Sequence, residues 1–434
     1  HEFYLENEEE SLMKAILPWH YIEQNIGKNI DIDYAVRFLQ NGLNSLLSSF
    51  VNGGFSYRGF ALYPLVKDVS KENISKIKRL KGIADFLGSS GYDFSDSIKK
   101  YRDKINSRDF AVILSALYRD FSRIKNKRMK AIKKVKCEEL DIGSYDKSDS
   151  GYLEPLSELK YYADRSLKRY LAGFYLHGSL STKDYVKGWS DVDTLAIVSK
   201  KAIKDPEALL ELRDKLYYIR HFFYKIDSLQ HHGSIIISEY DLENYCQAYF
   251  PIPIFKYAKS FFKDDVINNL RVRDYSSEAL GKLFWFVSYF RKLNIGKRPD
   301  PGSYDAKVLL HSITLFPAIY LQANGILVYK KFSFGIAKKD FKKSSWQVVD
   351  HAGSIRSNWK NRRNMPLIGC FSKINPLFYY QLNSRVLDLL NGADKRNKIN
   401  AKEIVEGMFK LSEEAWGNVK ENLGDLNYAK SKKL

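Results

Sequence analysis

Two aspartates at the start of a predicted strand are the residues of this chain best suited to chemistry. Asp191 and Asp193 stand two positions apart, directly before the apolar run Thr194–Val198. Side chains at positions i and i+2 of a strand project to the same side, so we expect the two carboxylates to face one point. Carboxylates this close repel one another unless a cation lies between them, and a hard divalent ion with phosphate co-ligands suits such donors. The pair therefore predicts a metal site that handles a phosphate-bearing substrate.

A glycine and a serine precede the aspartates in a context that favours a phosphate-binding turn. Gly178 and Ser179 follow the apolar run Leu171–Leu176, and Asp191 comes 12 residues after Ser179. Glycine lets a backbone approach a ligand closely, and the serine offers a hydroxyl and an N–H. We expect the two residues to cradle a triphosphate beside the metal site.

Together, Gly178-Ser179, Ser190-Asp191-Val192-Asp193 and the strand residues that follow resemble a known signature. It is the Gly-Ser plus Asp-x-Asp motif of the DNA polymerase beta-like nucleotidyltransferase superfamily. Its members include poly(A) polymerases, CCA-adding enzymes, antibiotic nucleotidyltransferases, cyclic-dinucleotide synthases and nucleotidyltransferase toxins. The resemblance implies a small mixed-sheet core that moves a nucleoside monophosphate from an NTP, with ATP expected, onto an acceptor hydroxyl and releases pyrophosphate.

The resemblance also implies a two-metal mechanism. Two Mg²⁺ ions, or alternatively Mn²⁺, would lie among Asp191, Asp193 and a third carboxylate. One ion would lower the pKa of the acceptor hydroxyl, while the other would hold the triphosphate and neutralise charge on the leaving pyrophosphate.

Three residues compete for the role of the third carboxylate: Asp227, Glu239 and Asp241. We favour Asp227, because it lies between apolar residues in 224–229, which we predict to be a strand. A helix over 205–223 would carry the chain back, so that this strand lies beside the Asp191 strand. Glu239 and Asp241 follow the apolar run 235–237, where exposure in a loop is expected.

Several basic residues are candidates for phosphate binding. Lys183 and Lys187 lie between Ser179 and Asp191, where either would meet a phosphate or be solvated. Lys330 and Lys331 follow an Asn-Gly turn, in a segment weakly similar to the lysine-bearing segment of helical domains in small nucleotidyltransferases. The segment 123–136, read as a helix, and the segment 356–363, with Trp359 among basic residues, suit phosphate contact or stacking, or are solvated surfaces.

Histidines near the motif are weaker candidates. His231 and His232 are adjacent, and adjacent histidines rarely converge on one ion, so we expect a polar turn there, with or without contact to substrate. His177 directly precedes Gly178 and is a candidate for packing at the site.

The pattern of apolar residues predicts an α+β chain with three domains. A helical N-terminal domain is expected over 1–150, with helices over 33–50 and 107–121, the latter capped by Ser107. A mixed-sheet nucleotidyltransferase core follows over 151–265, and a helical C-terminal substrate-binding domain over 266–434. Helices in the last part are expected over 278–292, 304–323, 376–390 and 403–423.

Composition limits the classes of function. An apolar content of 44% excludes general disorder, and an excess of 19 positive charges favours phosphate-rich partners. Three widely spaced cysteines predict neither a disulfide framework nor a metal site, and no apolar run suggests a signal peptide or membrane span, so we expect a cytoplasmic protein. The acceptor stays open between an RNA end and a small molecule or protein. An inactive nucleotide- or nucleic-acid-binding protein is the alternative, and no partner protein is predicted.

Overall fold

A five-stranded mixed sheet lies at the centre of the protein. The computed structural model describes residues 32–52, 71–89, 106–124, 131–227, 229–230, 232–262, 267, 269–295, 303–359 and 399–431. The strand order is β2-β6-β3-β4-β5, where β3 runs antiparallel to β4 and β6, and β4 runs parallel to β5. The strands are β2 (Glu138–Glu139), β3 (Leu171–His177), β4 (Asp193–Val198), β5 (Ile235–Ser238) and β6 (Lys259–Ser260). The chain therefore has the mixed α+β architecture expected from the sequence.

The two central strands are buried on both faces. Phe174 of β3 and Ala196 of β4 pack into one apolar core, whereas Tyr175 and Leu195 pack into another on the opposite face. This alternation follows from the two-residue period of a strand. Asp193, Leu195 and Ile197 consequently share one face of β4.

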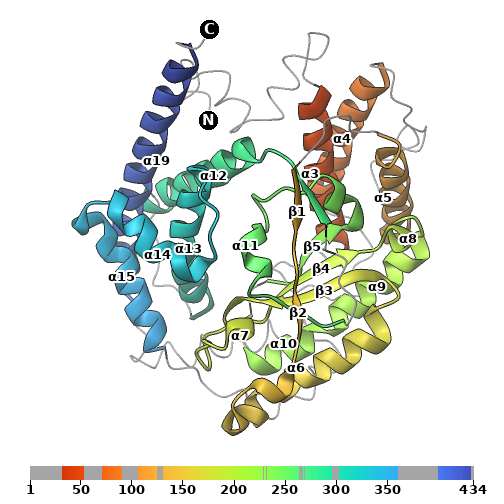
Figure 1. Cartoon of the computed structure of the whole chain (residues 1–434), viewed down its shortest axis with the longest axis horizontal. Coiled ribbons are helices and arrows are strands. Elements are labelled where there is room, and N and C mark those ends of the chain that lie inside the picture. The colour runs from red at the N-terminus through yellow and green to blue at the C-terminus, as the bar shows by residue number, and fades with distance from the viewer. Residues whose placement is uncertain are drawn as a thin grey trace.

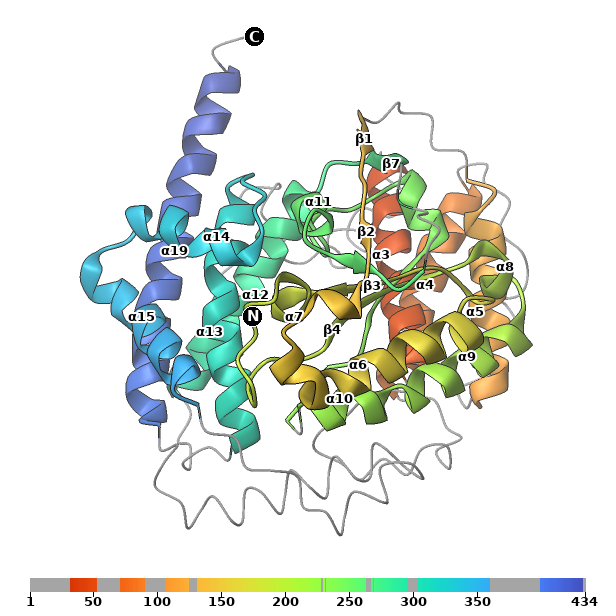
Figure 2. The ribbon, with the colours of Figure 1, turned by 60° about the horizontal axis from the view of Figure 1, so that its bottom comes forward.

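Helices from the first half of the chain cover one face of the sheet (Figures 1 and 2). The apolar stripe predicted for α3 is confirmed, because Leu39, Leu43 and Leu46 are fully buried. The helices of this part are α3 (Ile32–Val51), α4 (Lys71–Ser89), α5 (Ser107–Phe121), α6 (Ser150–Tyr162), α8 (Lys200–Ile203), α9 (Pro206–Tyr218) and α10 (Arg220–Ile226). The N-cap of α5 is Asn106 rather than Ser107, since the Asn106 side chain accepts from the Asp109 amide.

A second group of helices lies at the left in Figure 1, beyond the ends of β3 and β4, and has its own apolar core. These helices are α12 (Ser276–Ile295), α13 (Ser303–Ala323), α14 (Lys330–Ala337), α15 (Lys343–Ser357) and α19 (Ala401–Ser431). Within the described residues, one stretch, Asp305–Ala323 of α13, is long and apolar enough to cross a membrane. Of this stretch, 67% is buried inside the protein, as in a core helix of a bundle.

Smaller elements complete the structure. They are α7 (Gly178–Thr182), α11 (Ile252–Phe255), and an antiparallel pair of strands formed by β1 (Ala131–Lys134) and β7 (Asn269–Val272). Strand β1 lies in the basic segment 123–136, so the expectation of a helix there is wrong over Ala131–Lys134. The helix expected over 376–390 lies outside the described residues.

The strand expected over 224–229 is also wrong. Helix α10 extends to Ile226, and Asp227 is the residue that ends it. His221, Phe222, Phe223 and Tyr224 are all buried in this helix. Aromatic residues have a high intrinsic propensity for strands, but here the burial of their side chains in a packed helix outweighs that propensity.

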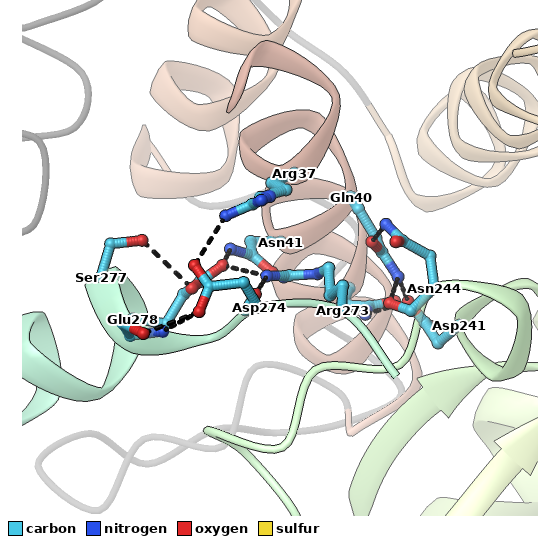
Figure 3. Close-up of polar contacts among 11 residues, drawn as sticks. Arg37, Gln40, Asn41, Asp241, Asn244, Arg273, Asp274, Ser277 and Glu278 are labelled. Atoms are coloured by element: carbon cyan, nitrogen blue, oxygen red, sulfur yellow. Dashed lines mark hydrogen bonds and ion pairs between the residues drawn. The ribbon is translucent and has the colours of Figure 1, made fainter. Parts of the chain in front are cut away.

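A buried polar network attaches α3 to the core (Figure 3). The Asp241 carboxylate accepts from the Ser238 backbone N–H at 2.7 Å, the Ser238 hydroxyl at 2.6 Å and the Asn44 amide at 2.7 Å. It also accepts from Gln40, as Figure 3 shows. Beside it, Arg273 donates to Asn41 and pairs with Glu278 on α12. The network therefore joins α3, the end of β5 and α12.

Replacement of Asp241 by alanine is expected to lower the free energy of unfolding by about 3 kcal/mol, because it leaves several buried donors without their acceptor. Urea unfolding followed by circular dichroism measures this. As a control, Asp214→Ala removes an exposed carboxylate and is expected to change stability by less than about 0.5 kcal/mol. Equal effects of the two substitutions would contradict a structural role for the network.

Candidate functional site

A cavity of about 890 Å³ lies between the sheet, α3, and helices α12 to α14. Its lining includes Gly178, Ser179, Asp191 and Asp193, the four residues that the sequence motif singled out. The cavity is large enough for a nucleotide, since pockets for drug-sized ligands measure about 300–1,000 Å³.

Both aspartates face the same histidine. The Nε2 atom of His232 lies 3.1 Å from Oδ1 of Asp193 and 3.4 Å from Oδ2 of Asp191. Although desolvation lowers the pKa of His232, hydrogen bonds and charges from the two carboxylates outweigh it and raise that pKa well above its usual value. Desolvation acts to raise the pKa of Asp193, but His232 and His177 together lower it to about 2. The imidazolium thus occupies the place between the carboxylates that suits a cation.

Gln230 fixes the backbone between the two aspartates. Its side-chain oxygen accepts from the Val192 N–H at 3.0 Å, and its amide nitrogen donates to the Val192 carbonyl at 3.2 Å and the His232 carbonyl at 3.0 Å. Gln230 is buried, so these bonds are shielded from water. The segment that carries His232 is therefore held against the segment that carries Asp191 and Asp193.

Gly178 lies tightly against Asp193. It has a φ of 74°, in the left-handed region that favours glycine, and a Cβ at this position would lie 2.1 Å from Oδ2 of Asp193. Only a residue without a side chain allows this approach. Ser179 begins the next turn, and its hydroxyl donates to that of Ser190 at 2.9 Å.

Asp227 is placed differently from the prediction. It is fully buried at the end of α10, is not part of the cavity lining, and pairs with Lys307 of α13 at 2.5 Å. Lys307 is also fully buried and lies 2.7 Å from Oδ1 of Asp191. Desolvation lowers the pKa of Lys307, but the charges of Asp191 and Asp227 outweigh it, so the pKa is raised and Lys307 is ionised.

The other two carboxylate candidates do not line the cavity either. Glu239 accepts from the Lys200 backbone N–H at 2.8 Å, and Asp241 belongs to the network that holds α3. Strands β4 and β5 are parallel, and Leu195 pairs with Ile235. Extending this register by two residues toward the N-terminus places Gly233 opposite Asp193. On this face, β5 therefore offers isoleucines beside the aspartates rather than a carboxylate.

The lysine candidates fall into two groups. Lys183 donates to the Ser144 carbonyl at 2.7 Å and Lys187 pairs with Asp149, and neither lines the cavity. Lys330 and Lys331 do line it, where Lys331 pairs with Asp184 at 2.9 Å. Desolvation, with repulsion from Arg356, lowers the pKa of Lys330 to about 8.

Three further basic side chains line or support the site and were not among our predicted site residues. Lys282 of α12 and His311 of α13 line the cavity, and Lys307 holds Asp191. The sequence does indicate that Lys307 is buried, because it lies one helical turn before Leu310 on the apolar face of α13. A buried lysine needs a counter-charge nearby. The sequence alone does not identify that counter-charge.

The aromatic residues near the site have structural contacts. Trp359 is buried, and its ring meets that of Trp189 edge-on with 5.0 Å between centroids, so it is not exposed for stacking on a base. His177 lines the cavity and packs edge-on against Phe250 at 5.0 Å.

The donor set fits a divalent cation bound together with a phosphate ligand. Asp191 and Asp193 converge on one point, and the cavity beside them has room for a triphosphate. Within the part of the chain that the structure describes, no group of three or more His, Cys, Asp or Glu side chains is arranged as a metal site. An ion here would thus complete its shell with phosphate oxygens and water, as Mg²⁺ commonly does.

Comparison with known proteins adds no relative to this picture. No family model, no curated protein and no solved structure matches the chain.

Proposed function

We propose that this protein is a divalent-metal-dependent nucleotidyltransferase, which moves a nucleoside monophosphate from an NTP onto an acceptor hydroxyl. The observation that carries the proposal is the convergence of Asp191 and Asp193 beside Gly178 and Ser179 at one end of a large cavity. These residues lie where two adjacent antiparallel strands meet the cavity: Gly178 and Ser179 follow β3, and Asp191 and Asp193 stand at the start of β4, where the register sets His177 opposite Asp193.

The basic residues that line the cavity favour a triphosphate substrate. Lys330, Lys331 and Arg356 line the cavity from α14 and α15, together with the two aspartates. Anionic phosphates would offset the mutual repulsion of Lys330 and Arg356, which contributes to the lowered pKa of Lys330. A phosphate chain between these cations and the aspartates would bring the α-phosphorus next to the carboxylates.

In this proposal, Asp191 and Asp193 would bind a divalent ion, which when bound supplies charge neutralisation at the phosphates and lowers the pKa of the acceptor hydroxyl. Such an ion would take the place that the His232 imidazolium holds between the carboxylates. Gln230 keeps the Val192 backbone fixed, so that both carboxylates keep their direction. Such preorganisation lowers the cost of reorganising charge in the transition state.

The test of this function is transfer of label. The full chain is incubated with each α-labelled NTP, Mg²⁺, and either RNA, protein or a metabolite extract. Label in one acceptor fraction supports the proposal and identifies the acceptor class, whereas bound NTP without any transfer supports an inactive nucleotide-binding protein.

Asp193→Asn is expected to lower nucleotidyl transfer by at least about 100-fold, because it removes a charged ligand from the metal site. Asp193 is the better test residue than Asp191, whose loss would also leave buried Lys307 with one partner fewer. Transfer is measured as label incorporated per minute, and thermal unfolding confirms that the variant is folded. A variant with wild-type transfer would refute the assignment.

Gly178→Ala is expected to reduce transfer by about 10-fold or more, since the new Cβ would displace the Asp193 carboxylate and occupy an unfavourable φ. The matched control is Gly417→Ala, in the exposed interior of α19 with open space around it, which is expected to keep full activity. If both variants retain full activity, the close approach of Gly178 does not matter for function.

Lys330→Gln is expected to raise the KM for NTP by about 10-fold, because it removes a charge-assisted contact with phosphate. Since the pKa of Lys330 is about 8, wild-type KM should rise from pH 7 to pH 9 as the ammonium loses its proton, and this rise should shrink in the variant. Lys338→Gln, an exposed control on the same segment, should leave KM unchanged. A KM that is the same in all three proteins would exclude Lys330 from nucleotide binding.

A further inference from the structure

The most unusual feature beside the site is a lysine buried between two carboxylates. Lys307 lies 2.7 Å from Asp191 and 2.5 Å from Asp227, and the side chains of Lys307 and Asp227 have no exposed area. The ammonium also lies over the ring of Trp189, 5.7 Å from its centroid. Three sides of this cation are therefore occupied by fixed partners.

Burying such a group is costly unless its charge is balanced. A buried charge without a partner destabilises a fold strongly, and replacing a whole buried ion pair by apolar residues is often neutral. Stability alone therefore does not account for a charged lysine against the aspartate of the motif. The contact between Lys307 and Asp191 affects the metal site directly, because Lys307 and a bound metal ion would compete for the same carboxylate.

Charge counting points to the role of Asp227. Without Asp227, Lys307 would interact fully with Asp191 and compete with a metal ion for it. With Asp227 present, the charge of Lys307 is balanced, and Asp191 and Asp193 keep a joint charge of −2 that a divalent ion could match once it replaces the His232 imidazolium between them. No carboxylate on β5 replaces Asp227 as a ligand on the Asp193 face, within the described residues.

We propose that Asp227 is a positioning residue rather than a metal ligand, and that it neutralises Lys307 so that Asp191 and Asp193 bind a single divalent ion. Lys307 fixes the direction of the Asp191 carboxylate from behind, while the cavity side of the carboxylate pair stays available. This inference rests on the proposed function only in taking Asp191 and Asp193 as the metal ligands.

The test is a titration of the full-length protein with Mn²⁺ alone, with free Mn²⁺ followed by electron paramagnetic resonance. We expect the wild type to bind one ion and Asp193→Asn to lose that binding. Asp227→Asn should bind one ion about 10-fold more weakly, because Lys307 then competes for Asp191. The double variant Asp227→Asn/Lys307→Met should recover affinity to within about threefold of the wild type, since the competing charge is gone.

Recovery separates the two roles, because removal of Lys307 cannot replace a lost ligand. The inference is overturned if the wild type binds two ions and Asp227→Asn binds one, or if these two proteins bind Mn²⁺ with equal affinity. It is also overturned if the double variant does not recover affinity, or if the wild type does not bind Mn²⁺. If Asp227→Asn does not fold, as judged by circular dichroism, the double variant decides: near-wild-type affinity supports the inference and strongly weakened affinity refutes it.

The titration is independent of nucleotidyl transfer. If the Mn²⁺ pattern holds and no NTP label is transferred, the proposed function fails while the positioning role stands. If label is transferred and two ions bind, the function stands and this inference fails.

Discussion

The ion pairs of Lys307 are the interactions on which the arrangement of the site depends. They connect α13 of the C-terminal helices with Asp191, just before β4, and with Asp227, at the end of α10. These groups are buried, so pulling α13 away from the sheet would expose opposite charges in a region closed to water, which costs several kcal/mol. The wall of the cavity that carries Lys330 and the wall that carries Asp193 are thus fixed relative to one another through a contact directly behind the carboxylates.

The wall of the cavity formed by α3 and β5 is held by hydrogen bonds, some to neutral groups and some to the Asp241 carboxylate. Helix α3 lies along β5, the outermost strand of the sheet, where Asn52 donates to the Ser234 carbonyl at 3.0 Å and Asn44 donates to Asp241. Covering an edge strand in this way removes a surface that would otherwise pair with other chains. Distant parts of the sequence, among them those around residues 45, 190, 235 and 320, therefore enclose one cavity, and the site requires all of them to fold together.

Local patterns in the sequence were sufficient for most of the elements and for the central motif. The strands at Leu171–His177 and Asp193–Val198 and the helices α3, α5, α12 and α13 follow from their apolar periodicity, and Gly178, Ser179, Asp191 and Asp193 line one cavity as expected. The segment 224–229 was predicted incorrectly as a strand, because its apolar residues fit a strand as well as the end of a buried helix. Helix α10 continues through Tyr224 and Ile226, which are both buried, and the tertiary packing that buries them is not encoded locally.

The partner of a buried charge is harder to predict than the charge itself. An aspartate between Ile226 and Leu229 and a lysine beside Ala306 and Leu310 are each recognisable as charges within apolar surroundings. Yet they lie 80 residues apart, and nothing in either segment specifies the other. Each pairs with whichever opposite charge the topology brings near, because an isolated buried charge is unstable. A carboxylate near a metal motif is therefore ambiguous in sequence: whether it faces the ion or a lysine depends on the side of the backbone to which the preceding helix turns it.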